Sequence, residues 1–438
     1  MLFTLCSCSG VFTSPLSLLT PPKSSGELAQ IEEYLKTTVG DYTLCYPQTE
    51  DFGNAINFCD LDCDKSDEAI VFYETTQGET VSVHMNVLAK FEKGYQSVDE
   101  QIISGIGIDR VGFWDVCLDD TLEIFVGSKI YNTNRQNLTV FSYENATLKS
   151  RYNSRYTDYF VTDLSAGAKP QILVLDIVNS VISSSEDLLG APITTTCTAS
   201  LVTLSSDSAP DGEAHVCGSA RFDSNVISFS KIARSTTADN APCVFVDAIV
   251  GENEMITEIF TYQNKKLKTT FYSKATKTTV ASRRESLISS NDVDGDGKIE
   301  IPKTYLCHGY ENEALSANKV YFTEWYEPQG NALTKHKASG FLNSADNYFV
   351  GVPKLLLGKI TAKKIMDERE RVFYSWNFGT NDFGDELFRI KVFYKNNFDK
   401  DSEGFSQIAT DDNYVYAVKV SKNDDIDLEY IKQNFRLL

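Results

Sequence analysis

The chain has 438 residues, of which 42% are hydrophobic, and its formal net charge is −20 at pH 7. This length predicts two or three domains, and the hydrophobic content is sufficient for a sizeable core. The negative charge disfavours nucleic acid and anionic membrane surfaces as partners. No apolar run approaches the ~20 residues of a membrane-spanning helix, so we expect a globular protein whose partners are proteins or glycans.

The first 25 residues have features of a lipoprotein export signal. Residues 5–8, with the sequence LCSC, nearly match a bacterial lipobox, although no basic segment precedes them and the apolar stretch is short. If the reading frame begins upstream of Met1, Cys8 is the lipidated first residue of the mature protein. The Pro- and Ser-rich residues 13–25 then form an extended tether.

We therefore expect residues 1–25 to comprise a signal-peptide remnant, a lipobox and a tether. The protein would be exported and attached to the outer face of the bacterial cell membrane by its lipid anchor alone. The alternative is a short tail with two ordinary cysteines.

Residues 27–36 follow the tether and carry the apolar side chains Leu28, Ile31 and Leu35 at helical spacing. This period predicts a short helix. Beyond it, apolar runs alternate with polar turns, which is typical of strands.

The first acidic loop, residues 60–68, has aspartates at alternate positions. Asp60, Asp62 and Asp64 are followed by Glu68, and in a tight loop these side chains converge on one point. Carboxylates packed so closely repel one another unless a hard cation such as Ca²⁺ binds them. The loop therefore predicts a Ca²⁺ site.

This first loop lacks glycine. Cys63 and Lys65 stand where a tight loop needs left-handed backbone, which costs a non-glycine residue roughly 1–2 kcal/mol. We therefore expect this loop to be somewhat strained, or bent differently, and to hold the weaker Ca²⁺ site of the chain. Cys59 and Cys63 also flank this loop, as either a local disulfide or two free thiols.

A second copy of the frame, residues 115–123, keeps Asp115, Asp119 and Glu123. The position between the first two aspartates is Cys117, a poor ligand for a hard cation. We expect marginal ion binding at most in this loop.

A third copy, residues 163–171, keeps Asp163 alone among the acidic ligands. We expect no ion there, and either backbone hydrogen bonds from Ser165 and its neighbours or plain turn geometry must shape the turn instead. Residues 235–244 are a fainter copy. Between these two copies, the Ser- and Thr-rich residues 180–208 predict a long loop or an extra hairpin.

The complete copy is residues 292–300. Gly295 and Gly297 supply the positive φ that a tight loop needs. An EF-hand would require glutamate at loop position 12, where Lys303 stands. We expect the strongest Ca²⁺ site here, with a dissociation constant on the order of 10⁻⁴ to 10⁻³ M. Its candidate ligands are the carboxylates of Asp292, Asp294, Asp296 and Glu300 and the carbonyl of Lys298.

These acidic loops between apolar runs resemble the FG-GAP (VCBS, integrin-α-like) propeller repeat, and more closely the propeller lipoproteins of clostridia and related gut bacteria. The resemblance covers roughly residues 52–330, and a period near fifty residues is typical of propeller blades. It implies a mainly β fold in which residues 26–335 form an FG-GAP-like β-propeller. Five blades are visible, and five to seven are expected in total. The resemblance implies structural Ca²⁺ in the loops and no particular activity.

The pattern changes in residues 336–438, where no acidic loop of this frame occurs. We expect a smaller C-terminal α+β domain that ends in a helix over residues 425–435. Its expected strands are residues 348–352, 359–365, 371–376, 387–394 and 414–420.

No catalytic motif is found in the sequence: it contains no HExxH, GxSxG or GxxxxGK[ST] pattern. We therefore expect a cell-surface binding or scaffold module with structural calcium, not an enzyme. One alternative is an envelope-assembly or protein-interaction factor that works through the C-terminal domain. Another is a propeller-based polysaccharide lyase or glycosidase, because two carboxylates suffice for glycoside hydrolysis.

Overall fold

The structure is a computed structural model that describes residues 25–48, 52–165, 169–181, 193–205, 214–315, 318–365, 368–398, 402–421 and 426–438. The predicted lipobox, with Cys8, and nearly all of the tether lie outside these ranges. Among the described residues, none of the helices has the length and apolar character needed to cross a membrane.

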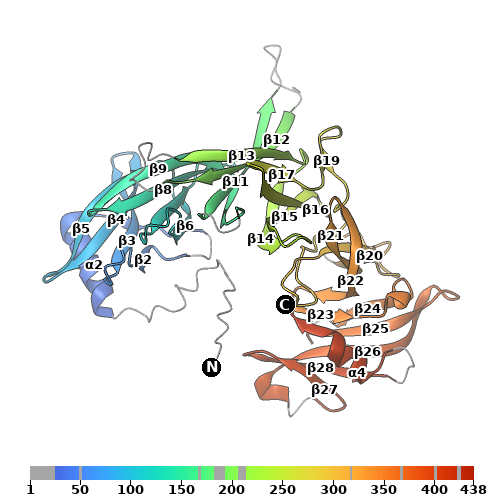
Figure 1. Cartoon of the computed structure of the whole chain (residues 1–438). Coiled ribbons are helices and arrows are strands. Elements are labelled where there is room, and N and C mark those ends of the chain that lie inside the picture. Colours follow the sequence, from blue (N-terminus) through green and yellow to red (C-terminus); the bar gives the residue numbers. More distant parts are fainter. Residues whose placement is uncertain are drawn as a thin grey trace, which may run out of the picture. The chain divides into compact units, whose positions relative to one another are not determined.

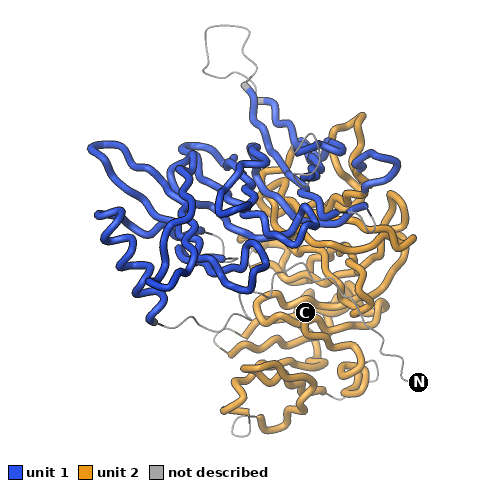
Figure 2. Tube along the Cα trace, turned by 60° about the vertical axis from the view of Figure 1, so that its left-hand side comes forward, with its two compact units in different colours: residues 1–224, 262–268 blue, residues 225–261, 269–438 orange. Residues whose placement is uncertain are grey.

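The fold is mainly β, and its sheets are antiparallel and built largely from strands that follow one another in the chain (Figure 1). The chain divides into two compact units, which are described separately below (Figure 2). Unit 1 comprises residues 1–224 and 262–268, and unit 2 comprises residues 225–261 and 269–438.

Unit 1 begins with helix α2 (Ser25–Thr38) and contains three sheets. The first sheet has the order β1–β3–β4–β5, with β2 also paired to β3, and the others have the orders β6–β7–β8–β9 and β10–β11–β12–β13. The strands are β1 (Thr43–Leu44), β2 (Ile56–Cys59), β3 (Glu68–Gln77), β4 (Thr80–Phe91), β5 (Gly94–Ile103), β6 (Ile108–Trp114), β7 (Glu123–Ser128), β8 (Gln136–Glu144), β9 (Thr147–Tyr156), β10 (Asp158–Thr162), β11 (Gln171–Val181), β12 (Ile193–Thr203) and β13 (His215–Phe222).

The fourth sheet has the order β14–β15–β16–β17, and a small hairpin β18–β19 follows it. The fifth sheet, of unit 2, has the order β20–β21–β22–β23–β29, and the sixth has the order β24–β25–β26–β28–β27. The strands are β14 (Ser228–Thr236), β15 (Pro242–Gly251), β16 (Glu254–Gln263), β17 (Lys266–Thr269), β18 (Tyr272–Ser273), β19 (Thr278–Thr279), β20 (Ile301–Leu306), β21 (Tyr321–Gln329), β22 (Ala332–Asn343), β23 (Tyr348–Gly351), β24 (Ile360–Ile365), β25 (Glu370–Asn377), β26 (Asp382–Tyr394), β27 (Ser406–Thr410), β28 (Tyr414–Val420) and β29 (Phe435–Leu437). The helices are the 3-10 turns η2 (Lys354–Leu356) and η3 (Lys395–Asn397) and the α-helix α4 (Leu428–Asn434).

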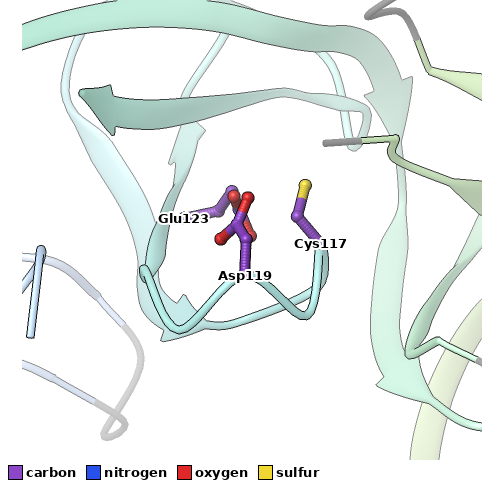
Figure 3. Close-up of side chains that lie close together, drawn as sticks. All are labelled: Cys117, Asp119 and Glu123. Atoms are coloured by element: carbon purple, nitrogen blue, oxygen red, sulfur yellow. The ribbon is translucent and has the colours of Figure 1, made fainter. Parts of the chain in front are cut away.

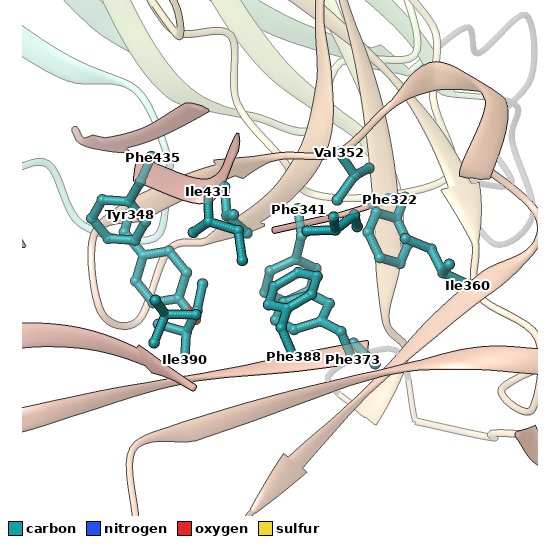
Figure 4. Packing of buried hydrophobic residues seen from close by; sticks show 14 of the residues in the cluster. Phe322, Phe341, Tyr348, Val352, Ile360, Phe373, Phe388, Ile390, Ile431 and Phe435 are labelled. Atoms are coloured by element: carbon teal, nitrogen blue, oxygen red, sulfur yellow. The ribbon is translucent and has the colours of Figure 1, made fainter. Parts of the chain in front are cut away.

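Neighbouring sheets pack face to face within each unit. In unit 1, Phe72 and Met85 of the first sheet share a core with Val111 and Phe113 of the second, and another core joins the second sheet to the third. In unit 2, one core joins the fourth and fifth sheets, and a large aromatic core joins the fifth and sixth (Figure 4). Strands buried on both faces read as continuous apolar runs, as residues 69–73 of β3 do.

Both helices expected from the sequence are confirmed. In α2, Ile31 and Leu35 are fully buried against the first sheet, because their spacing places them on one face. In α4, Asp427 caps the N-terminus by accepting a hydrogen bond from Tyr430 N.

The five strands expected beyond residue 336 are confirmed as β23, β24, β25, β26 and β28. Of the expected loop or extra hairpin over residues 180–208, residues 182–192 and 206–208 lie outside the described residues, and residues 193–203 form a regular strand. Within this stretch β12 is an integral strand of the third sheet and pairs with β11 along its length. Its alternate side chains Cys197, Ala199 and Leu201 are buried, which gives it the period of a half-buried strand.

The expected boundary between residues 335 and 336 falls inside β22. The fifth sheet joins β20 and β21, which precede this point, to β23 and β29, which follow it. The backbone hydrogen bonds of one sheet therefore connect the two sides.

Candidate metal centre

Four acidic loops are closed in the same register. We number each loop from its first aspartate, so that position 9 is Glu68, Glu123, Gln171 or Glu300. In every loop the residue before position 1 pairs with the residue at position 9. The pairs are Cys59 with Glu68, Trp114 with Glu123, Thr162 with Gln171 and Asn291 with Glu300.

The first aspartate organises the backbone of its loop. In the Asp292 loop, Asp292 Oδ1 accepts a hydrogen bond from Asp296 N (3.2 Å), and its Oδ2 accepts one from Gly297 N (2.9 Å). Lys298 N in turn donates to Asp296 Oδ1 (2.9 Å). The same three bonds recur in the loops that begin at Asp60 and Asp115. Three loops therefore share one backbone conformation.

Left-handed backbone occurs at loop positions 4 and 6. Gly295 and Gly297 have φ of 76° and 83°. In the first loop Cys63 and Lys65 take these positions with φ of 57° and 76°, which confirms the strain expected there. The second loop has the same feature at Leu118 and Asp120.

The carboxylate at position 9 is buried under its loop. Glu68, Glu123 and Glu300 are 4%, 1% and 0% exposed, and each accepts a hydrogen bond from the N–H at position 2, at 2.9–3.0 Å. Burial raises the pKa of Glu300 to about 8. The hydrogen bond from position 2 opposes this effect, and the neighbouring aspartates reinforce it. The same causes raise the pKa values of Glu68 and Glu123 to about 7.

Two loops offer all-oxygen ligand sets. The candidate ligand atoms of Asp292, Asp294 and Glu300 lie within 4.8 Å of one another, as do those of Asp60, Asp62 and Glu68. Asp64 and Asp296 also stand in these loops, where each accepts a backbone N–H two residues further on.

Glu300 provides the test of whether a cation fits. Its Oε1 atom is buried and has no hydrogen-bond partner among the described residues. An unpartnered buried carboxylate oxygen is costly unless a cation or donor satisfies it. A hard oxygen-seeking ion such as Ca²⁺ suits this donor set, and Asp292, Asp294 and Glu300 would hold it.

The second loop brings Cys117 beside Asp119 and Glu123 (Figure 3). The Cys117 thiol donates a long hydrogen bond to Ser205 O (3.7 Å). Burial and the adjacent Glu123 hold the pKa of this thiol far above its usual range, so the sulfur stays protonated. A neutral thiol is no ligand for a hard cation, and the marginal binding expected for this loop stays a prediction.

The third loop is closed without a carboxylate at position 9. Gln171 Oε1 accepts a hydrogen bond from Leu164 N (3.1 Å), and Gln171 Nε2 donates to Ser165 Oγ (2.7 Å). Ser165 N also donates to Asp163 Oδ1 (3.1 Å). Of the two expected alternatives, the described residues of this loop show the hydrogen bonds at Ser165.

The loops of the first two sheets are joined directly. Leu122 N, at the end of the second loop, donates to Leu61 O of the first (2.9 Å). Cys59 and Cys63 of the first loop are both free thiols, so the second of the two alternatives for this pair holds.

Sequence reasoning missed Lys337, a residue of β22. Its ammonium lies 2.8 Å from Asp294 Oδ2 and 2.5 Å from Asp296 Oδ2. Burial acts to lower the pKa of Lys337, but the bonds to these aspartates outweigh it and hold that pKa above its usual range. No local pattern reveals the contact, because the lysine lies 41 residues beyond Asp296.

No protein-family model and no curated protein matches the chain. The solved structure of the exotype rhamnogalacturonan lyase YesX is 12% identical, with a TM-score of 0.29, and the match covers 71% of this chain and 64% of the lyase. A rhamnogalacturonan lyase of Bacillus licheniformis is also 12% identical, with a TM-score of 0.29, and the match covers 69% of this chain and 65% of the lyase. The structure of a protein from Lactobacillus plantarum is 6% identical, with a TM-score of 0.30, and the match covers 78% of this chain and 93% of that protein.

The chain thus spans slightly less than two thirds of the length of these two lyases. At such TM-scores the likenesses carry no inference about activity.

Proposed function

We propose that the protein is a cell-surface binding or scaffold module of the FG-GAP propeller type, with Ca²⁺ as a structural ion of its acidic loops. The observation that carries the proposal is the one loop conformation shared by the Asp60, Asp115 and Asp292 loops. A buried glutamate underlies it in the ligand-complete copies. Loops that keep their conformation while losing ligands serve the scaffold, not a reaction.

The sheet topology supports a propeller. Six sheets of four or five strands occur in the described part of the chain, and most are simple meanders. Meanders that pack face to face through apolar cores are typical of propeller blades. Five of these sheets begin within residues 26–335, where five to seven blades are expected from the sequence, and the sixth lies within residues 336–438. A protein or glycan ligand at the cell surface is the expected partner, and nucleic acid is not.

Calorimetric titration with Ca²⁺ tests the structural ion. Chelator-treated protein is expected to bind Ca²⁺ at the Asp292 and Asp60 loops. Asp294→Ala removes the first contribution and Asp62→Ala the second, because each takes away a central carboxylate. Each variant is the control for the other. Isotherms that both variants leave unchanged would contradict the proposal.

Asp294→Ala should also lower the melting temperature in Ca²⁺ but change it little in chelator, because an ion that binds only the folded state stabilises by mass action.

Export is tested separately. With the upstream reading frame restored, the protein is expected in the membrane fraction, attached through Cys8. Globomycin, which blocks lipoprotein processing, should cause a precursor to accumulate, and Cys8→Ala should abolish lipidation. A native protein found in the cytosolic fraction, with no precursor, would rule out the lipid anchor.

A further inference from the structure

Lys337 places a positive charge inside the Asp292 loop. Its ammonium bridges Asp294 Oδ2 (2.8 Å) and Asp296 Oδ2 (2.5 Å), and the side chain is only 13% exposed. The third candidate carboxylate, Glu300, keeps one buried oxygen without a partner. The lysine thus neutralises the outer carboxylates of the loop and leaves the inner one unsatisfied.

Among the described residues, no cation takes the place of Lys337 in the Asp60 loop. In the described part of the chain, no lysine, arginine or histidine forms an ion pair with Asp60, Asp62, Asp64 or Glu68. The two loops share backbone conformation and ligand types, so the lysine is a major electrostatic difference between them.

We propose that Lys337 is a tethered cation that Ca²⁺ must displace from the Asp292 loop, so that this lysine sets the Ca²⁺ affinity of the loop. The inference rests on the proposed structural Ca²⁺ sites. An ammonium bonded to Asp294 would lie next to a Ca²⁺ that the same carboxylate binds, and like charges so close repel strongly. The competition offsets the advantage that Gly295 and Gly297 give this loop.

A cavity beside the loop can receive the displaced side chain of Lys337. A cavity of about 280 Å³ adjoins the loop and is lined by Asp294, Lys337, Ser339, Tyr430 and Asn434, among others. Its wall carries polar groups that can solvate an ammonium as well as the cationic Lys354 and Arg436, and the lysine can leave the loop by rotation of its own flexible stem.

Lys337→Met tests the competition, since methionine keeps the length of the side chain and removes the charge. We use the Asp62→Ala background, in which only the Asp292 loop is expected to bind. There Lys337→Met should raise Ca²⁺ affinity about tenfold to hundredfold, because two charge-assisted hydrogen bonds no longer compete with the ion. Lys337→Arg, which retains a charge, should stay near the parent affinity.

Lys335→Met is the matched control. Lys335 is on the same strand and pairs with Glu327, but it forms no ion pair with the loop carboxylates among the described residues. This variant should leave the affinity unchanged. Equal affinities in Lys337→Met and the parent would overturn the inference, whereas absence of Ca²⁺ binding in every variant would overturn the proposed sites themselves.

Chemical labelling gives a second readout. The Lys337 amine should react slowly with an acylating reagent in chelator and faster in Ca²⁺, as measured by peptide mass spectrometry. Labelling of Lys335, whose side chain is 52% exposed, should not respond to Ca²⁺. A Lys337 labelling rate that Ca²⁺ leaves unchanged, in protein that binds the ion at this loop, would overturn the displacement.

Discussion

Replacing Asp247 by alanine is expected to lower the free energy of unfolding by about 3–5 kcal/mol, because it leaves a buried guanidinium without its partner. Arg284 Nη2 lies 2.9 Å from Asp247 Oδ1, and the side chains are 1% and 0% exposed. Ser290 donates to Asp247 Oδ2 through both its N–H (2.7 Å) and its hydroxyl (2.8 Å). Urea unfolding of the whole protein, followed by tryptophan fluorescence, measures the loss.

A double variant distinguishes the cost of a charge buried alone from the net contribution of the ion pair. Asp247→Leu combined with Arg284→Met removes both charges and should lose less stability than Asp247→Ala, since no charge remains buried alone. Asp247→Asn keeps the shape of the side chain, and its loss in the free energy of unfolding should lie between those of the two other variants. A loss below about 1 kcal/mol in Asp247→Ala, typical of an ordinary substitution, would show that water reaches Arg284.

Local chemistry explains why much of the acidic loops could be predicted. Alternate aspartates, a glutamate at position 9 and residues at positions 4 and 6 lie within nine residues of one another, so their spacing already restricts the backbone. The positive φ at Cys63 and Lys65 was predictable for this reason. Four strands of the sixth sheet were likewise visible in the sequence, as residues 387–394 were for β26, whereas β27 was not predicted.

Contacts between distant segments could not be predicted in this way. Lys337 reaches the Asp292 loop only because the fifth sheet brings β22 beside it. Asp247 meets Arg284 across 37 residues. β12 was missed because its Ser and Thr residues resemble a loop, although their alternate neighbours are buried. In each case tertiary pairing decides what local propensity leaves undetermined.

The expected boundary at residue 335 can be tested through the aromatic core of the fifth and sixth sheets. Phe373 of β25 is fully buried and stacks on Phe388 at 4.3 Å between ring centroids. It also contacts Phe341 of β22 and Phe322 of β21 edge to face, at 5.3 and 6.2 Å (Figure 4). Its ring therefore touches residues on both sides of the boundary.

Phe373→Ala is expected to cost about 3–5 kcal/mol, the usual penalty for truncating a buried aromatic ring. Phe378→Ala is the control. Phe378 lies two residues beyond Trp376 of β25 and is 64% exposed, so its loss should change the free energy of unfolding by no more than about 0.5 kcal/mol.

Hydrogen exchange then distinguishes one core from two domains. If the fifth and sixth sheets unfold together, amides of β21 and β25 lose protection in parallel. If residues 336–438 form an independent domain, β25 loses protection while β21 keeps it, and the sequence-based boundary is correct.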